Sequence, residues 1–245
     1  MNPVLFNMLL TLGIFAFSYF FGAIPTAVII GKVFYKKNPL DYGSHNAGGT
    51  NAGRVLGKKA GVVVITLDIL KTATVFWTVF ALLSFSPLQK VASFWDGGQI
   101  FLWGSLVFAS LGHCFSPYLK GKGGKAVACF YGSVGGTSPI LFPLCFLIFF
   151  LCFKGTKKVM SKASILTGAI LTLLSWVLSI IALCLGSGFD SSIFSWTFGL
   201  GGGLRFGLES GIAITLVYLI LVYRHRDNIR RIKKGEEKPL QWKSR

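Results

Sequence analysis

Two segments of this chain combine glycine with side chains that bind anions. One is residues 43–54, Gly-Ser-His-Asn-Ala-Gly-Gly-Thr-Asn-Ala-Gly-Arg, and the other is residues 120–125, Lys-Gly-Lys-Gly-Gly-Lys. Glycine lets several backbone N–H groups point at one anion, and the positive N-terminal end of a following helix adds to the attraction. Because Lys and Arg add full charges, the two segments indicate a site for phosphorylated molecules.

The first segment is dense in groups that hydrogen-bond to oxygen. Arg54 can form a two-pronged contact with a phosphate. The other candidate ligands of substrate oxygens are Ser44, Asn46, Thr50 and Asn51. The alternative is an ordinary flexible loop whose arginine contacts lipid headgroups.

The second segment ends in Gly123-Gly124-Lys125, which we predict to open a helix and to bind an anion there. Lys122 and Lys125 supply its charge. Ala126 follows Lys125, whereas a Walker A loop needs Ser or Thr at that place, so a nucleotide triphosphatase is disfavoured. The alternative is a loop that is basic only because it faces the cytoplasm.

Three histidines are candidates for orienting phosphate or accepting a proton: His45, His113 and His225. None is followed by Asp five positions later, so the H-x-x-x-x-D pattern of acyltransferases that use acyl-CoA is absent. His225, Asn228 and Arg231 recur every three residues and share one face if this segment is helical. An amphipathic helix that only binds headgroups would show the same pattern.

Asp68 and Lys71 lie inside an apolar run and, three residues apart, share a helix face. Ionisable side chains at bilayer depth are costly and often functional. A structural ion pair that fixes helix packing would give the same pattern, and the sequence does not decide between the two.

The elements that must position these residues are membrane helices. The chain has 245 residues, of which 53% are hydrophobic and only 13% charged, whereas a soluble domain carries about 25% charged residues. The apolar runs are continuous rather than alternating, so helices are expected and a β-barrel is not. No Lys or Arg precedes Lys32, so we expect residues 4–30 to be a retained first span rather than a cleaved signal peptide.

Charge indicates which helix ends face the cytoplasm. The net charge is +17. Lys and Arg gather at 32–59, 120–125, 154–162 and 224–245, and the exceptions are Lys71, Lys90 and Arg205. Because the basic segments lie between apolar runs, positive-inside orientation and anionic headgroups explain them better than nucleic acid does.

The apolar run at 126–152 decides the topology, because residues 132–139, rich in Gly and Ser, interrupt it. If it forms a hairpin of two short helices, segments 120–125 and 154–162 face the cytoplasm together. We therefore predict an all-α integral membrane protein, a single domain of seven helices, two of them short, with the N-terminus outside and the C-terminus in the cytoplasm. The expected spans are about 4–30, 60–85, 99–118, 126–136, 139–152, 163–186 and 207–223, with a basic tail at 224–245.

The cysteines give no sign of a metal site. Cys114, Cys129, Cys145, Cys152 and Cys184 lie in or beside apolar runs without C-x-x-C spacing. They indicate neither a disulfide framework nor a zinc site, and we expect no metal and no cofactor.

At the residues named above the sequence resembles the bacterial acyl-phosphate:glycerol-3-phosphate acyltransferases of the PlsY type. Three segments carry the resemblance, in order along nearly the whole chain: Gly43-Ser44-x-Asn46-x-Gly48-x-Thr50-Asn51 with Arg54, Leu56-Gly57-Lys58 and Asp68-x-x-Lys71; Gly112-His113-x-Phe115 with Lys122-Gly123-Gly124-Lys125-x-Val127-Ala128; and His225-x-x-Asn228-Ile229-x-Arg231 with Gly235 and Glu237. Ser161 matches a serine of the same family.

The resemblance implies a seven-helix enzyme of the inner (plasma) membrane with its active site on the cytoplasmic side. It would move an acyl group from acyl phosphate to the 1-hydroxyl of glycerol 3-phosphate. The products would be 1-acylglycerol 3-phosphate (lysophosphatidic acid) and phosphate, in the first acylation of phospholipid synthesis. Membrane lipids and the soluble enzyme that makes acyl phosphate are candidate partners, and nucleic acid is not.

The resemblance also assigns roles to residues. The catalytic residues would be Lys125, Arg54, His225 and Asn228. The substrate-binding residues would be Ser44, Asn46, Thr50, Asn51, His113, Lys122, Gly123, Gly124, Ser161, Arg231 and Glu237. No side chain is an obvious base and no His–carboxylate pair is evident, which is compatible with the family's use of a substrate phosphate as proton acceptor.

The sequence departs from the family's pattern at six positions, His45, Gly49, Gly121, Ala126, Cys129 and Lys162, which bear on loop geometry and turnover more than on reaction type. A membrane transporter for a phosphorylated solute is the alternative function. A transporter should carry binding groups near the bilayer midplane, whereas the polar groups here gather at one end. A non-catalytic lipid-binding scaffold is a third reading.

Overall fold

The computed structural model describes residues 2–85, 88, 99–185, 194–197 and 205–242, and within these ranges the chain is helical, with no strand. Four helical segments are long and apolar enough to cross a membrane, or five if the bent pair Leu208–Arg224 and Arg226–Lys233 counts as one. Many large apolar side chains face outward, among them Leu12, Phe150 and Leu173. Such an extensive apolar exterior is typical of a protein that lies in lipid.

The helices differ in length more than the apolar runs suggest. They are α1 (Pro3–Gly22), α2 (Thr26–Tyr35), α3 (Gly49–Val55), α4 (Lys58–Phe85), α6 (Gln99–Cys114), α7 (Val127–Gly135), α8 (Leu141–Gly155), α9 (Met160–Leu185), α10 (Leu208–Arg224) and α11 (Arg226–Lys233), with 3₁₀ turns η1 (Pro39–Asp41) and η3 (Pro117–Leu119). Each apolar run of the sequence contains at least one helix. Some residues that the sequence predictions include lie outside the described residues: Lys90, residue 186 and residues 243–245.

The first apolar run consists of two helices rather than one. α1 ends at Gly22 and α2 begins at Thr26, because Pro25 has no N–H to donate and disfavours helical backbone at Ile24. Other elements satisfy the carbonyl groups at this break. Ser116 donates its hydroxyl to Ala23 O (2.7 Å), and Lys71 donates its ammonium to Ile24 O (3.0 Å). The break therefore ties the first run to α4 and to the segment after α6.

Glycine lets the membrane helices approach closely. A Cβ at Gly22 would overlap the backbone of Ala109 in α6, and a Cβ at Gly112 would overlap that of Tyr19 in α1. Small residues at such contacts are common between membrane helices, since lipid gives no hydrophobic force that drives helices together. This contact fixes the end of α6, where His113 lies in the last turn before the second glycine segment.

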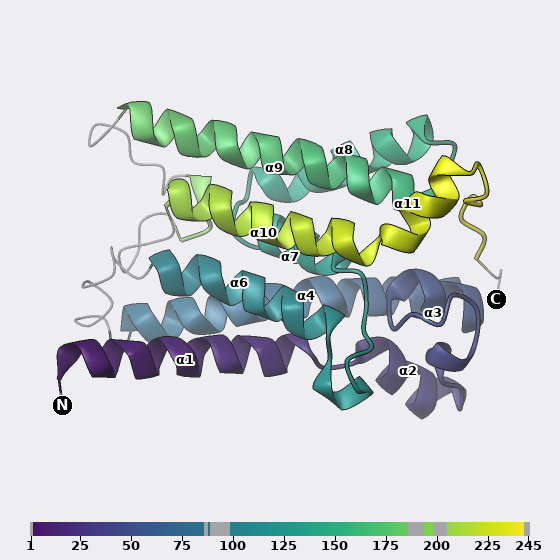
Figure 1. The fold of residues 1–245 in the computed structure, drawn as a ribbon, viewed down its shortest axis with the longest axis horizontal. Helices are drawn as coiled ribbons and strands as arrows, with labels where there is room; N and C mark the ends of the chain where they lie inside the picture. Colours follow the sequence, from purple (N-terminus) through teal and green to yellow (C-terminus); the bar gives the residue numbers. More distant parts are fainter. Residues whose placement is uncertain (1, 86–87, 89–98, 186–193, 198–204, 243–245) are drawn as a thin grey trace.

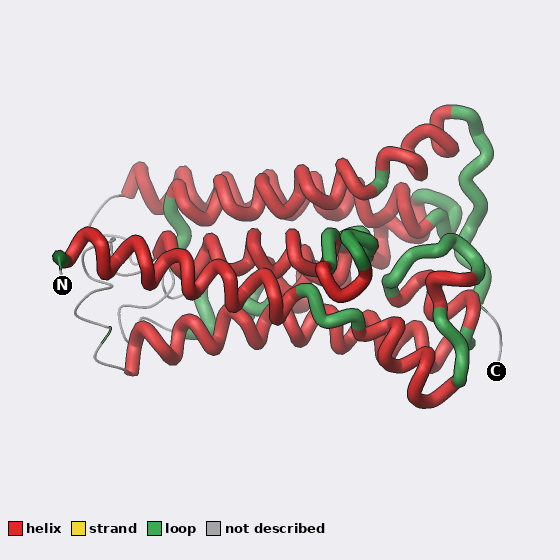
Figure 2. Tube along the Cα trace, turned by 60° about the horizontal axis from the view of Figure 1, so that its bottom comes forward, coloured by secondary structure: helices red, strands yellow, loops and turns green. Residues whose placement is uncertain are grey.

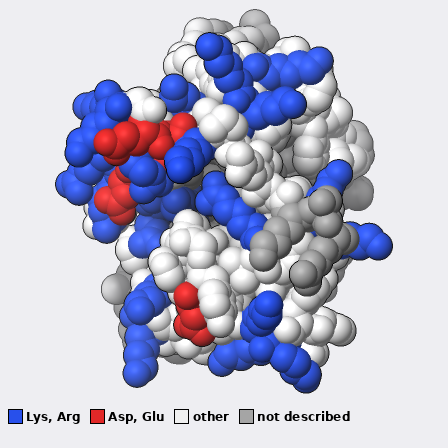
Figure 3. Space-filling model, turned by 90° about the vertical axis from the view of Figure 1, so that its right-hand side faces the viewer, with Lys and Arg blue, Asp and Glu red and all other residues white. Residues whose placement is uncertain are grey.

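The polar segments of the sequence meet at one end of the bundle (Figures 1 and 2). Asn46 and Arg224 both donate to Gly123 O at 3.1 Å, and the Leu240 N–H donates to Lys158 O at 2.9 Å. α7 and α8 run antiparallel, with the turn between them directed away from this end (Figure 1). Figure 3 shows Lys and Arg side chains over this end, with few Asp and Glu among them.

Candidate active site

A cavity of about 210 Å³ lies at this end, lined by α3, α4, α6, α7, α8, α9, α11 and the chain on either side of them. Its interior is apolar, with Ile65 and Ile69 from α4, Tyr131 from α7, and Phe146 and Phe149 from α8. Its polar rim adjoins a wider cavity of about 650 Å³, and both are lined by Ser44, Asn46, Arg54, Lys125, Asn228 and Glu237. A cationic rim beside an apolar interior suits a molecule with an anionic head and a hydrocarbon chain.

The structure brings most of the predicted site residues to these two cavities. The smaller one is lined by Ser44, Asn46, Thr50, Asn51, Arg54, His113, Lys125, Ser161, His225, Asn228 and Glu237. Arg231 lines the wider one. Lys122 is exposed and lines neither, and Gly123 and Gly124 are buried and line neither.

Lys125 is held by a network of side chains from other elements. Its Nζ donates to Asn228 Oδ1 at 2.5 Å, and the Asn228 amide donates to Glu237 Oε1 at 2.6 Å. Glu237 also accepts from Ser161 Oγ at 2.7 Å and from Arg231 Nε at 2.6 Å. The network joins the residues before α7 to α9, α11 and the tail. An ammonium has three N–H donors, so Lys125 can bind a phosphate while Asn228 holds it.

Burial tunes the proton affinity of this network. Burial, together with the nearby charge of Arg231, lowers the pKa of Lys125 to about 8. Burial alone would raise the pKa of Glu237, but hydrogen bonds from Arg231, Asn228 and Ser161 hold it below its ordinary value. At neutral pH the site therefore contains an ionised Glu237 and a protonated Lys125 whose charge a bound phosphate would stabilise.

Gly124 packs against α6, which differs from the anion-binding role predicted for the glycines. α7 begins at Val127, so Lys125 precedes its first turn. The Gly124 N–H donates to His113 O at 3.0 Å, and a Cβ at Gly124 would overlap the His113 ring. The Gly123 and Gly124 carbonyls accept from Arg224. The glycines therefore permit close packing, and Lys125 is the residue of Gly123-Gly124-Lys125 that lines the cavity.

Asn51 shapes the first segment. Its Oδ1 accepts from the Ser44 N–H at 2.8 Å. Its amide nitrogen lies 2.7 Å from Pro39 O, 3.1 Å from Tyr42 O and 3.1 Å from Asn46 O. The side chain is buried, and both ends of its amide are engaged by the loop. These contacts make Asn51 a support of the loop, and its contact with a substrate oxygen stays a prediction.

Arg54 differs from Asn51 in the contacts of its polar group. It lies one turn after Thr50 on α3 and lines both cavities. Within the part of the chain that the structure describes, no hydrogen bond or ion pair holds its guanidinium. A guanidinium free of protein partners can donate two parallel hydrogen bonds to a phosphate.

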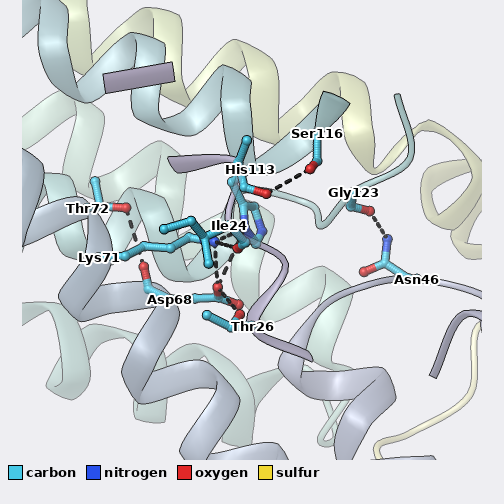
Figure 4. Close-up of polar contacts among 10 residues, drawn as sticks. Ile24, Thr26, Asn46, Asp68, Lys71, Thr72, His113, Ser116 and Gly123 are labelled. Atoms are coloured by element: carbon cyan, nitrogen blue, oxygen red, sulfur yellow. Dashed lines mark hydrogen bonds and ion pairs between the residues drawn. The ribbon is translucent and has the colours of Figure 1, made fainter. Parts of the chain in front are cut away.

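A buried ionic cluster borders the cavity (Figure 4). Lys71 Nζ lies 2.8 Å from Asp68 Oδ1 and 3.0 Å from His113 Nδ1, and Thr26 donates to the same carboxylate oxygen at 2.6 Å. Because an ammonium can only donate, His113 Nδ1 accepts and Nε2 carries the proton. His113 Nδ1 and Asp68 Oδ1 are 3.7 Å apart and both accept from Lys71, so no hydrogen bond joins them directly. Lys71 contacts both, which makes the cluster a structural link between α2, α4 and α6.

His225 lies buried at the junction of α10 and α11 and lines the smaller cavity. Its Nδ1 lies 2.8 Å from Leu221 O. A carbonyl only accepts, so Nδ1 carries the proton and Nε2 is an acceptor. His225 can therefore receive a hydrogen bond from a substrate hydroxyl.

Arg224 shapes the site although sequence reasoning did not select it. It ends α10 and donates to the carbonyl oxygens of Gly123 and Gly124. Its guanidinium carbon lies 5.3 Å from the centre of the Phe115 ring. Nothing in the sequence separates Arg224 from the other basic residues of the tail.

Within the described residues, no group of three or more His, Cys, Asp or Glu is placed to hold a metal ion.

A cationic rim and an apolar interior, enclosed by helices that can cross a bilayer, define a membrane enzyme that acts on a lipid-like substrate. Residues 12–235 match the family model described as glycerol-3-phosphate acyltransferase. The chain belongs to the glycerol-3-phosphate acyltransferase family.

Similar proteins and structures support this assignment. The glycerol-3-phosphate acyltransferase of Staphylococcus haemolyticus is 39% identical over 227 residues, 92% of this chain and 95% of that protein. That of Staphylococcus aureus (strain Newman) is 37% identical over 226 residues, with the same coverage.

The fold matches two crystal structures of PlsY, an integral membrane glycerol 3-phosphate acyltransferase. The glycerol 3-phosphate form has a TM-score of 0.72 and 27% identity, covering 94% of this chain and 96% of that chain. The lysophosphatidic acid form has a TM-score of 0.70 and 27% identity, covering 94% of each. This chain is therefore a multi-pass membrane acyltransferase of lipid synthesis, and the transporter alternative is not supported.

Proposed function

We propose that this protein transfers an acyl group from acyl phosphate to the 1-hydroxyl of glycerol 3-phosphate. One observation carries the proposal: Arg54 and Lys125 both line the mouth of a cavity whose interior is apolar. Acyl phosphate has the matching chemistry, with a phosphate at one end and a hydrocarbon chain at the other. A glycerol 3-phosphate form and a lysophosphatidic acid form of a similar protein support the acceptor and the product.

The first task of the site is to hold two phosphates close together. Lys125, Arg54 and Arg231 offset their repulsion, and the ionised Glu237 keeps Arg231 in place at 2.6 Å. Ser44, Asn46 and Thr50 bind oxygens of the acceptor. Holding the two substrates in one geometry lowers the activation free energy, because the entropy of bringing them together and orienting them is already lost on binding.

The chemical step needs little further help from the protein, because acyl phosphate is a mixed anhydride whose carbonyl carbon is already activated. The glycerol 1-oxygen forms a bond to the acyl carbon, and the bond from that carbon to the phosphate oxygen breaks. The hydroxyl proton passes to a phosphate oxygen of the substrates, and His225 Nε2 helps to orient the hydroxyl. Lys125 stabilises the charge that grows on the departing phosphate.

We propose further that the bundle has seven spans, with the N-terminus outside and the site open to the cytoplasm. The basic segments before α3, α7 and α9 and after α10 lie at one end, and the positive-inside rule assigns such an end to the cytoplasm. The soluble enzyme that makes acyl phosphate would approach from this side.

An assay with two donors tests the proposed function. Purified protein is given radiolabelled glycerol 3-phosphate with either acyl phosphate or acyl-CoA, and labelled lysophosphatidic acid is measured. We expect product from acyl phosphate and none above the protein-free blank from acyl-CoA. Comparable turnover with acyl-CoA would rule out acyl phosphate as the dedicated donor.

A further inference from the structure

The tail after α11 turns back across the site. Gly235 has a φ of +73°, and the N–H groups of Gly235 and Glu236 donate to Ile232 O and Arg231 O. This is the Schellman ending of a helix, which needs a left-handed residue at the glycine position. The reversal places Glu237 against Ser161 and Asn228, and the following residues Lys238, Pro239 and Gln241 line the wider cavity.

The tail is attached again beyond this wall. The Leu240 N–H donates to Lys158 O at 2.9 Å, in the segment between α8 and α9. The Trp242 indole N–H then donates to Thr50 O at 3.3 Å, on α3. The tail therefore bridges α11, the start of α9 and α3, and Trp242 is its contact with α3.

The indole of Trp242 packs against a glycine of α3. A Cβ built on Gly53 would come within 2.5–2.8 Å of three indole atoms, and no atom of any other residue is as near to it. Gly61 of α4 packs against the same short helix, since a Cβ there would lie 2.7 Å from Gly53 Cα. α3 is thus held between α4 on one side and Trp242 on the other.

α3 needs such support because of its length and its ends. It has seven residues, and no side chain caps its N-terminus. Isolated helices this short are unstable in water, so packing must fix the position of α3. Arg54 follows Gly53 directly, and its guanidinium has no protein partner of its own within the described residues.

We propose that Trp242 is a positioning residue for acyl transfer: it presses α3 against α4 and so sets where Arg54 meets the substrate phosphate. This inference rests on the proposed function. Trp242 lies beyond residues 12–235, which match the family model, and it lines neither cavity. Its effect is therefore exerted through α3.

The full-length protein tests this with a double-mutant cycle on the contact. Trp242→Ala removes the indole, and Gly53→Ala adds a methyl group that pushes the indole away. Each should lower kcat/KM for glycerol 3-phosphate about ten- to hundredfold, because a displacement of about 1 Å in a site can cost that much. In the Trp242→Ala background, Gly53→Ala should add almost nothing, since the atoms it would strike are absent. Trp242→Phe keeps the packing and should retain most of the activity.

Three comparisons distinguish the outcomes. Gly13→Ala, at a glycine whose Cβ would meet nothing within 4 Å, controls for the substitution itself and should leave the rate unchanged. Additive losses in the double variant, or a wild-type rate for Trp242→Ala, would overturn the positioning role. A wild-type protein that makes no product from acyl phosphate would instead contradict the proposed function. The melting temperature of each variant in detergent, if unchanged, shows that lost activity does not come from unfolding.

Discussion

At the scale of single residues, Lys125 combines a fixed position with a weakly held proton. Asn228 orients its ammonium, Glu237 orients Asn228, and burial lowers its pKa to about 8. A cation of this kind interacts more strongly as charge grows on a bound phosphate. Two measurements on Lys125 follow from this.

Lys125→Ala should lower kcat steeply while the protein still inserts and purifies normally. Losing a charge-assisted contact made mainly in the transition state costs about 2–4 kcal/mol, or about 30- to 1000-fold in rate. Lys162→Ala is the matched control, because Lys162 is exposed in the first turn of α9 and lines neither cavity. If Lys125→Ala kept more than about half of the wild-type kcat, Lys125 would not be the phosphate-stabilising cation, since a 1.4 kcal/mol effect is already tenfold.

The rate should also depend on pH through Lys125. Its pKa in the free protein is about 8, so kcat/KM for acyl phosphate should fall as pH rises through about 8. Lys125→Arg, which stays charged, should move this fall to higher pH, and spontaneous hydrolysis of acyl phosphate is subtracted with a protein-free blank. Because the fold lowers this pKa from 10.5, the unfolded chain binds more protons between about pH 8 and pH 10.5. The free energy of unfolding therefore rises with pH over this range as far as Lys125 contributes to it. Unfolding driven by Lys125 therefore cannot cause the loss of activity, and an alkaline limb that is identical in Lys125→Arg would contradict the assignment.

At the scale of elements, the Asp68 cluster holds the break between α1 and α2 in place. Lys71 bonds to Ile24 O at the break and to Asp68, and their side chains are only 7% and 1% exposed. A buried ion pair of this kind adds little to the free energy of unfolding as a whole. If one partner is removed, however, the other remains as an uncompensated buried charge.

Asp68→Leu should therefore destabilise the protein by about 3–5 kcal/mol, because it leaves the Lys71 ammonium buried without its carboxylate. Adding Lys71→Met should restore much of the loss, although Ile24 O then lacks one donor. Thermal unfolding of the single and double variants in the same detergent measures both effects. A double variant no more stable than Asp68→Leu would show that the cluster does more than neutralise charge.

At the scale of the whole molecule, the hairpin of α7 and α8 decides the topology. α7 has 9 residues and α8 has 15, so at about 1.5 Å per residue they reach roughly 14 Å and 23 Å, against about 30 Å of hydrocarbon. Short helices are tolerated at such depth when other helices surround them. Their antiparallel course brings the segments before α7 and after α8 to the same end of the bundle.

Cysteine labelling tests this topology. Lys122→Cys and Lys157→Cys place exposed thiols on either side of the hairpin, in a Cys184→Ser background because Cys184 is the exposed native cysteine. An impermeant maleimide should label both positions in inside-out vesicles and neither in intact cells. Labelling of position 157 from outside while position 122 stayed inside would refute the hairpin.

The sequence by itself determined that this is an all-helical membrane protein, and it predicted which residues carry the chemistry. Both conclusions depend on local properties, since a run of apolar residues must form a helix in lipid whatever surrounds it. The charge pattern is also a local property, because each basic segment marks the end of the helix beside it. Lys125, Arg54 and His225 were all named before the structure placed them at one cavity.

Only the tertiary structure decided what each polar group contacts. Lys125 and Asn228 are 103 residues apart in the sequence, yet Lys125 Nζ and Asn228 Oδ1 lie 2.5 Å from each other. The Gly124 N–H donates to His113 O, and both ends of the Asn51 amide contact the loop, and neither contact can be read from the sequence. The contact of Lys71 with His113 and the contact of Trp242 with α3 were equally hidden. The reason is physical: apolar pattern and net charge act along the chain, whereas a hydrogen bond depends on distance and direction in space, which packing alone sets.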